Sequence, residues 1–176
     1  PDEVFIHTGS AEDCNIVKHM SLDKGEEADL VLPEHTIHFD LPEDQGRLIK
    51  QTFYIVSDDE GISSLAKKEP RTESHAYMRQ YMRGIMRGKT MFVGFYSRGP
   101  AGAHSSIPAI QISSSTYVMH SAALLYRNCF AVFDKEVVRR GEFFTNLHSE
   151  GSNRSEDIDK ARVYMERSWQ TTYDTS

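Results

Sequence analysis

Short runs of apolar residues alternate along the chain with segments in which apolar residues recur every three or four positions. The runs are rich in β-branched and aromatic residues, which is typical of strands. We predict strands at residues 4–7, 52–56, 91–96 and 109–112, with further candidates near 36–39 and at 143–147 and 162–165. Because residues 52–56 are β-branched or aromatic throughout, we expect this strand to be buried on both faces.

The longer spacing predicts helices at residues 11–20, 74–86, 117–127 and 131–139. Ser10 stands three residues before Asp13, which forms an approximate capping box for the first helix. Hydroxyl residues at 113–116 precede the third helix as N-caps, and Gly141 follows the last helix as a C-cap. In the second helix apolar residues recur four apart, and we expect this stripe to pack in the core: Tyr77, Tyr81 and Ile85, with Met78, Met82 and Met86.

Strands and helices interleave along a chain of 176 residues, which is the size of one ordinary domain. This order predicts the α/β class, with a mixed β-sheet covered by helices, as a single domain over residues 1–176. The chain begins with Pro1 rather than Met and stops soon after an apolar and aromatic stretch. We therefore expect it to be a piece of a longer protein.

The composition of the chain argues against two classes of function, nucleic-acid binding and membrane insertion. The formal net charge is −6, which disfavours a nucleic-acid-binding surface, and no apolar run approaches the ~18 residues that a membrane span needs. The two cysteines, Cys14 and Cys129, lie far apart and match no ligand spacing, which favours a reducing cytosol. Since no leader sequence is evident either, we expect a cytoplasmic protein with no membrane and no nucleic-acid partner.

Two chemical motifs are weak. Residues 84–90 (Gly-Ile-Met-Arg-Gly-Lys-Thr) resemble a phosphate-binding P-loop, but three residues separate the glycines where four are needed, and the helix precedes the strand. We interpret Gly88 as a helix C-cap that leads into the strand at 91–96. His35, His38 and Asp40 form a local group of candidate metal ligands, although no second ligand motif supports it.

Two arginines are better candidates for binding an anion. Arg47 lies just before the strand at 52–56, and Arg98 lies in the glycine-rich turn that follows the strand at 91–96. A guanidinium group holds a carboxylate or phosphate through two parallel hydrogen bonds, and loops at strand ends are the usual place for a site in an open α/β sheet.

Several segments, in the same order, resemble the amino-terminal domain of GTP-type phosphoenolpyruvate carboxykinase. The family runs Gly-Arg-Thr-Met-Tyr-Val, then Phe-Ser-Met-Gly-Pro, then Thr-Asp-Ser-x-Tyr-Val and a downstream Arg. This chain has Gly-Lys-Thr-Met-Phe-Val at 88–93, Tyr-Ser-Arg-Gly-Pro at 96–100, Ser-Ser-Ser-Thr-Tyr-Val at 113–118, and Arg127. His-Thr-Gly-Ser at 7–10, Pro-x-Asp-x-x-Arg at 42–47 and Leu-His-Ser-Glu-Gly at 147–151 are similar to further family blocks.

The resemblance implies a lyase of gluconeogenesis that decarboxylates oxaloacetate and phosphorylates the enolate from GTP, giving phosphoenolpyruvate and CO₂. Arg47 falls on the arginine that grips the substrate, and we add Arg98 and Ser115 as candidate substrate contacts. The resemblance places the GTP site and the Mn²⁺ or Mg²⁺ ligands in a C-terminal nucleotide-binding domain, so we assign no metal or cofactor ligand in this chain. We expect the isolated lobe to be inactive.

This chain departs from the family pattern at three positions: family Met is Arg98, family Asp is Ser114, and the Glu two places after the substrate arginine is Ile49. The departures leave the phosphoryl donor open among GTP, ATP and diphosphate. Two other readings also stay open, a stand-alone dicarboxylate-binding sensor or regulatory module without catalysis, and a histidine-dependent metal protein.

Overall fold

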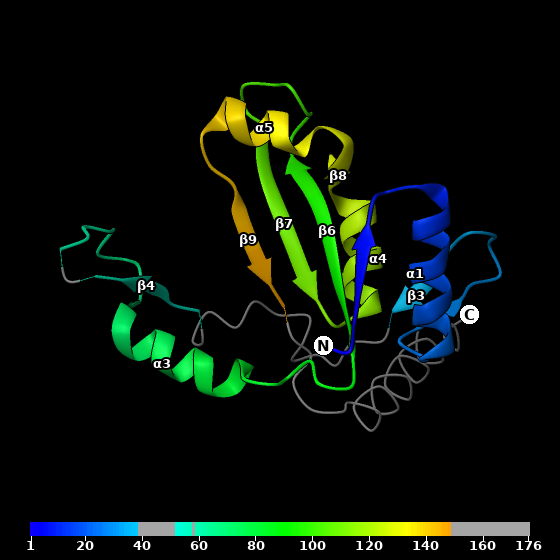
Figure 1. Cartoon of the computed structure of the whole chain (residues 1–176), viewed down its shortest axis with the longest axis horizontal. Coiled ribbons are helices and arrows are strands. Elements are labelled where there is room, and N and C mark those ends of the chain that lie inside the picture. Colours follow the sequence, from blue (N-terminus) through cyan, green and yellow to red (C-terminus); the bar gives the residue numbers. More distant parts are fainter. Residues whose placement is uncertain (39–51, 58, 149–176) are drawn as a thin grey trace, which may run out of the picture.

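A computed structural model of the protein describes residues 1–38, 52–57 and 59–148. Its main sheet has the strand order β1-β6-β7-β9, with β8 paired to β6 beside β1 (Figure 1). Strands β1 and β6 run parallel, β6 and β7 antiparallel, and β7 and β9 parallel, so the sheet is mixed as predicted. The strands are Glu3–His7 (β1), Thr90–Arg98 (β6), Ile107–Ser113 (β7), Arg127–Asn128 (β8) and Phe144–Leu147 (β9).

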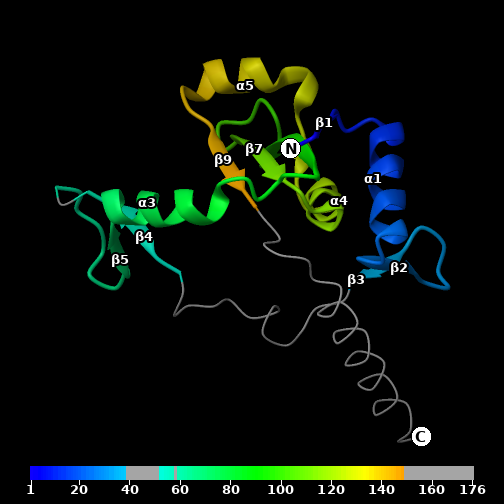
Figure 2. The same ribbon diagram turned by 60° about the horizontal axis from the view of Figure 1, so that its bottom comes forward.

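Helices lie on both faces of this sheet. Helices α1 (Ala11–Asp23) and α4 (Thr116–Leu125) cover one face, while the 3-10 helix η2 (Phe130–Val132) and helix α5 (Phe133–Arg140) lie across one end of the other (Figures 1 and 2). The α/β class is therefore confirmed. No helix in the described ranges is long and apolar enough to cross a membrane.

The core lies between the sheet and helices α1 and α4. Its centre is a cluster of buried side chains from these three elements, with Phe5 packed against it: Val17, Phe92, Tyr96, Met119 and Ala122. The Phe5 and Phe92 rings on the parallel strands β1 and β6 have centroids 5.7 Å apart. Aromatic side chains that strand alternation places on one face thus supply much of the apolar surface buried there.

The predicted helix ends are confirmed where they depend on local hydrogen bonds. The Ser10 hydroxyl accepts a hydrogen bond from the Asp13 N–H at 3.1 Å, and the Asp13 carboxylate accepts from the Thr8 N–H at 2.7 Å. Helix α5 ends at Arg140 and is capped by Gly141, whose φ of 83° lies in the left-handed region. Each of these contacts joins residues close in sequence, which is why the sequence alone predicts them.

The remaining elements lie outside the main sheet. Strands β2 (Glu27–Asp29) and β3 (Thr36–His38) form an antiparallel pair beside α1, and β3 confirms the brief strand predicted near 36–39. Strands β4 (Tyr54–Val56) and β5 (Lys68–Pro70) form a parallel pair next to helix α3 (Arg71–Met82), to one side of the sheet in Figure 1. The strand predicted at 162–165 lies outside the described residues.

Two predictions about burial were wrong. Strand β4 pairs with β5 rather than entering the main sheet, and Tyr54 is 60% exposed. Helix α3 has no buried residue, and its stripe residues Tyr77 and Tyr81 are each 60% exposed, although Met86, the last residue of the predicted stripe, is buried beyond the helix end. Periodicity shows which side chains share a face, but the partner of that face is set by contacts distant in sequence.

The predicted end of the second helix was also wrong. Helix α3 ends at Met82 because Arg83 is extended and Gly84 has a φ of 71° in the left-handed region. Gly88 is therefore not a helix C-cap but part of the turns that follow, and its N–H donates to the Asp2 carboxylate at 3.1 Å. The segment that resembles a P-loop thus ties the start of β6 to the start of the chain.

Gly94 permits the close approach of β6 to the core. A Cβ at this position would lie 2.5 Å from the Tyr96 ring and 2.7 Å from the end of Met119, both buried. We expect Gly94→Ala to lower the free energy of unfolding by about 1 to 3 kcal/mol through overpacking. Urea denaturation followed by circular dichroism measures this loss. The control is Gly61→Ala, where no atom lies within 4 Å of the new Cβ; equal stability of the two variants would contradict the prediction.

Candidate functional site

Arg98 ends strand β6, where it is exposed and borders a small pocket. Its guanidinium carbon lies 5.6 Å from the centre of the Tyr126 ring, within the range of a cation–π contact. The pocket is lined by side chains of β6, β7, β9 and the residue after α4: Tyr96, Arg98, Ala109, Gln111, Tyr126 and Asn146. The predicted anion-binding arginine therefore has a concave surface beside it.

Two amide side chains stand next to Arg98 in this pocket. Gln111 of β7 and Asn146 of β9 are direct partners in the parallel register, so both side chains lie on the same face of the sheet. An amide NH₂ and a guanidinium both donate hydrogen bonds, and together they suit a carboxylate. Neither amide was predicted from the sequence; for Gln111 the available signal was one polar residue inside an apolar strand.

The turn after Arg98 is held in place by Glu136 of α5. One Glu136 carboxylate oxygen accepts from the Gly102 N–H at 2.7 Å, and the other accepts from the Ser106 hydroxyl at 2.6 Å. Hydrogen bonds from Arg139 and Ser106 lower the pKa of Glu136 to about 2. The carboxylate is thus ionised at any physiological pH and fixes the loop that begins at Arg98.

Ser115 has a different environment. It is the N-cap of α4, where its hydroxyl accepts from the Val118 N–H at 3.2 Å. The same hydroxyl donates to the Glu26 carboxylate at 3.4 Å, and the Ser115 N–H donates to the Ser113 hydroxyl at 3.0 Å. The predicted helix cap is confirmed, and the side chain is buried among these partners.

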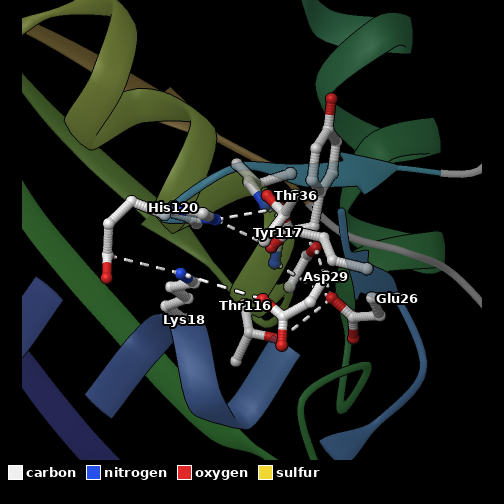
Figure 3. Close-up of polar contacts among 11 residues, drawn as sticks. Lys18, Glu26, Asp29, Thr36, Thr116, Tyr117 and His120 are labelled. Atoms are coloured by element: carbon white, nitrogen blue, oxygen red, sulfur yellow. Dashed lines mark hydrogen bonds and ion pairs between the residues drawn. The ribbon is translucent and has the colours of Figure 1, made fainter. Parts of the chain in front are cut away.

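The N-terminus of α4 already holds an anionic group of this chain. One Glu26 carboxylate oxygen accepts from the Thr116 hydroxyl and from the Tyr117 N–H, each at 2.9 Å (Figure 3). Free N–H groups and the helix dipole attract negative charge to such a terminus. Glu26 therefore occupies the position that an external anion would take at this end of the helix.

A second carboxylate, Glu27, attaches the β2–β3 pair to α4. His120 Nδ1 lies 2.9 and 2.8 Å from its two oxygens, and the Thr36 hydroxyl donates at 2.7 Å (Figure 3). Burial alone would raise the pKa of Glu27, but these hydrogen bonds, with that of His120 the strongest, outweigh burial and lower it. The network joins three elements that are distant in sequence.

Arg98 and Ser115 lie at opposite ends of the β6–β7 ladder. Arg98 pairs with Ile107 at one end, and Phe92 pairs with Ser113 at the other. The two pairs are six residue steps apart along the strand, or about 20 Å at ~3.3 Å per residue. An acid of three or four carbons does not span that distance, so one molecule does not contact both residues. Arg47 lies outside the described residues.

The two histidines proposed as metal ligands from the sequence, His35 and His38, contact other groups of the chain. His35 Nδ1 is 2.9 Å from the Pro33 carbonyl oxygen, and the His38 ring stacks on Tyr117 with centroids 3.2 Å apart. Asp40 lies outside the described residues. Within the ranges that the structure describes, no three His, Cys, Asp or Glu side chains gather as a metal site.

The mixed sheet and its helical cover define an α/β domain, with a small polar pocket at the end of β6. Comparison with known proteins identifies it more closely. The chain matches the family described as "Phosphoenolpyruvate carboxykinase N-terminal domain" over residues 1–176, and it belongs to that family.

Two curated relatives carry the same name. The chain is 37% identical over 177 residues to "Phosphoenolpyruvate carboxykinase [GTP]" of Thermococcus kodakarensis, a match that covers 98% of this chain and 28% of the relative. It is 38% identical over 173 residues to the protein of that name from Saccharolobus solfataricus, with 98% and 27% covered. The chain thus spans little more than a quarter of the length of these relatives.

The Glu27 network predicts a pH-dependent loss of stability. A carboxylate whose pKa is lowered by folding stabilises the protein above its unfolded pKa of about 4.3, and this contribution is lost as the pH falls through the folded value. We expect Glu27→Gln to lower the free energy of unfolding by about 1 to 3 kcal/mol at pH 7, and by less as the pH falls below about 4.

Urea denaturation of the wild type and the variant across this pH range measures the difference. The control is Glu34→Gln, an exposed carboxylate 3.5 Å from Lys18, which should change stability by less than about 0.5 kcal/mol. A constant difference between Glu27→Gln and the wild type at every pH would show that the ionised carboxylate is not the cause.

Proposed function

We propose that this chain is the substrate-binding amino-terminal lobe of a phosphoenolpyruvate carboxykinase. The enzyme converts oxaloacetate and GTP to phosphoenolpyruvate, CO₂ and GDP, as a decarboxylating lyase of gluconeogenesis in the cytoplasm. The observation that carries the proposal is the family match over residues 1–176, together with relatives that bear the carboxykinase name along 98% of this chain. The stand-alone sensor has no such relative among these proteins.

The lobe's task is to hold a small polyanion. Oxaloacetate and phosphoenolpyruvate both present carboxylates, and a bidentate guanidinium fixes the orientation of a carboxylate. Arg47 is the principal substrate residue in the proposal because it falls on the substrate arginine of the family pattern. Arg98 is a second anion contact, supported by the amides of Gln111 and Asn146 that border the same pocket.

Ser115 is the remaining proposed contact. Because it lies about 20 Å from Arg98 along the β6–β7 ladder, the proposal for Ser115 requires the substrate to bind at the N-terminal end of α4 instead. Its hydroxyl would then have to exchange Glu26 for the substrate. The two arrangements predict different effects of substitution at Arg98 and Ser115.

The phosphoryl donor and the metal belong to another part of the proposed enzyme. GTP with Mn²⁺ or Mg²⁺ would bind a C-terminal nucleotide-binding domain, and ATP or diphosphate are the alternative donors. The described residues of this chain do not fit a metal ion, since they bring no three metal-binding side chains together. We therefore derive no step of the reaction through a metal held by this lobe.

Replacing Arg47 tests the proposal directly. In the whole enzyme, loss of a bidentate charged contact should lower kcat/KM for oxaloacetate by about 30- to 1000-fold, or about 2 to 4 kcal/mol, chiefly through KM. Steady-state assays of the wild type and of Arg47→Ala measure this effect. The wild-type rates with GTP, ATP and diphosphate identify the phosphoryl donor. Arg140→Ala, which removes an arginine 3.4 Å from Glu142 on the surface of α5, is the control. Unchanged kinetics of Arg47→Ala would remove Arg47 from the site.

Substitution of Arg98 by methionine, the residue of the family pattern, tests whether Arg98 contacts the substrate. We expect Arg98→Met to lower kcat/KM for oxaloacetate by about 10-fold, since a neutral thioether gives up one charge-assisted contact. Arg98→Lys keeps the charge and should fall between the wild type and Arg98→Met. Stability should not change, because Arg98 is exposed. If Arg98→Met keeps wild-type kinetics while Ser115→Ala loses activity, the substrate binds at the α4 end of the sheet.

A further inference from the structure

One row of apolar side chains crosses strands β1, β6, β7 and β9 on the face opposite α1 and α4. The strand registers pair Ile6 with Val93, Val93 with Ile112, and Ile112 with Leu147. Paired residues in neighbouring strands point to the same face of a sheet. Val4 and Met91 form a second pair on this face, next to the first row. We name these six residues the open face.

The open face is only partly covered. Helical cover on this side of the described chain comes from η2 and α5, whose Phe130 and Phe133 rings lie 5.4 and 5.0 Å from the Phe95 ring. Beyond that end the apolar side chains emerge into solvent: Ile6 is 43% exposed, Val4 52% and Leu147 55%. In Figure 1 this face is turned toward the reader, with α4 behind the strands and α5 across their upper end.

The open face is as apolar as a sheet face that is buried inside a protein. A sheet with one solvated face alternates apolar and polar residues along each strand, whereas strands that are apolar on both sides are typical of sheets covered by two layers. In β6 the residues Met91, Val93 and Phe95 are apolar on the open side, and Phe92 and Tyr96 are apolar on the core side. A large contiguous apolar surface on a domain marks a place where something packs.

We propose that the open face packs against a second layer formed by another part of the same polypeptide. The inference rests on the proposed function, which makes the protein as long as its relatives. Those relatives contain nearly three-quarters of their length outside the matched region, since the match covers 28% and 27% of them. The layer would present apolar side chains from a helix or a sheet, because the open face offers no charged group for a polar partner to pair with.

Hydroxyl-radical footprinting of the whole wild-type protein tests the proposal. Each labelling rate is divided by the rate of the same residue in the urea-unfolded protein. We expect the ratios of Ile6, Val4 and Leu147 to fall severalfold, to the level of the buried Val17, while Val138, which is 84% exposed, stays reactive. Ratios that match the partial exposure found here would overturn the proposal. Ratios that are low in a dimer and rise on dilution to the monomer would also overturn it, because a second copy would then be the cover.

A pair of matched variants adds an independent measurement. In the whole protein Ile6→Asp should shift the urea midpoint strongly downward or abolish folding, whereas Val138→Asp should leave it nearly unchanged. Equal midpoints for the two variants would overturn the proposal. Carboxykinase assays of the same wild-type sample separate this proposal from the proposed function. If the enzyme is active but the open face is labelled, only the proposal of a second layer is refuted. If the open face is protected but the enzyme is inactive, only the proposed function is refuted.

Discussion

The structure depends on the hydrogen-bond ladder of β6. This nine-residue strand pairs with β1 and β8 along one edge and with β7 along the other, so it sets the register of the main sheet. The same ladder directs Phe92 and Tyr96 into the core and carries Arg98 to the edge of the polar pocket. A shift of one residue would exchange its two faces and displace both the core and the candidate site.

Buried or partly buried carboxylates then fix the segments that the ladder leaves free. Glu136 holds the turn after β6, and Glu26 and Glu27 hold the α4 N-terminus and the β2–β3 pair at the other end of the sheet. Hydrogen bonds to an ionised group are the stronger kind, and a buried carboxylate with several donors is costly to disturb. The two ends of the sheet are therefore stabilised independently, which separates the surroundings of Arg98 from those of Ser115.

The sequence predicted the features that depend on near neighbours. The strands at 91–96 and 109–112, the caps at Ser10 and Ser115, and the αL glycine at Gly141 all follow from local propensity and short-range hydrogen bonds. The burial of residues 52–56 and of the α3 stripe could not be predicted in this way, because it depends on where each element meets the rest of the chain. Gln111 and Asn146 escaped notice for the same reason, since only the β7–β9 register brings them together.

Arg98 shows how a departure from the family pattern is accommodated by the fold. The family pattern that the sequence resembles has Met at this position, an apolar side chain, whereas arginine carries an apolar stem and a charged end. Here the guanidinium lies over the Tyr126 ring, so the aromatic face receives a cation. The arginine thus adds positive charge beside the Gln111 and Asn146 amides. In the proposed substrate lobe, Arg98 therefore adds a charged donor to the one that Arg47 is proposed to supply.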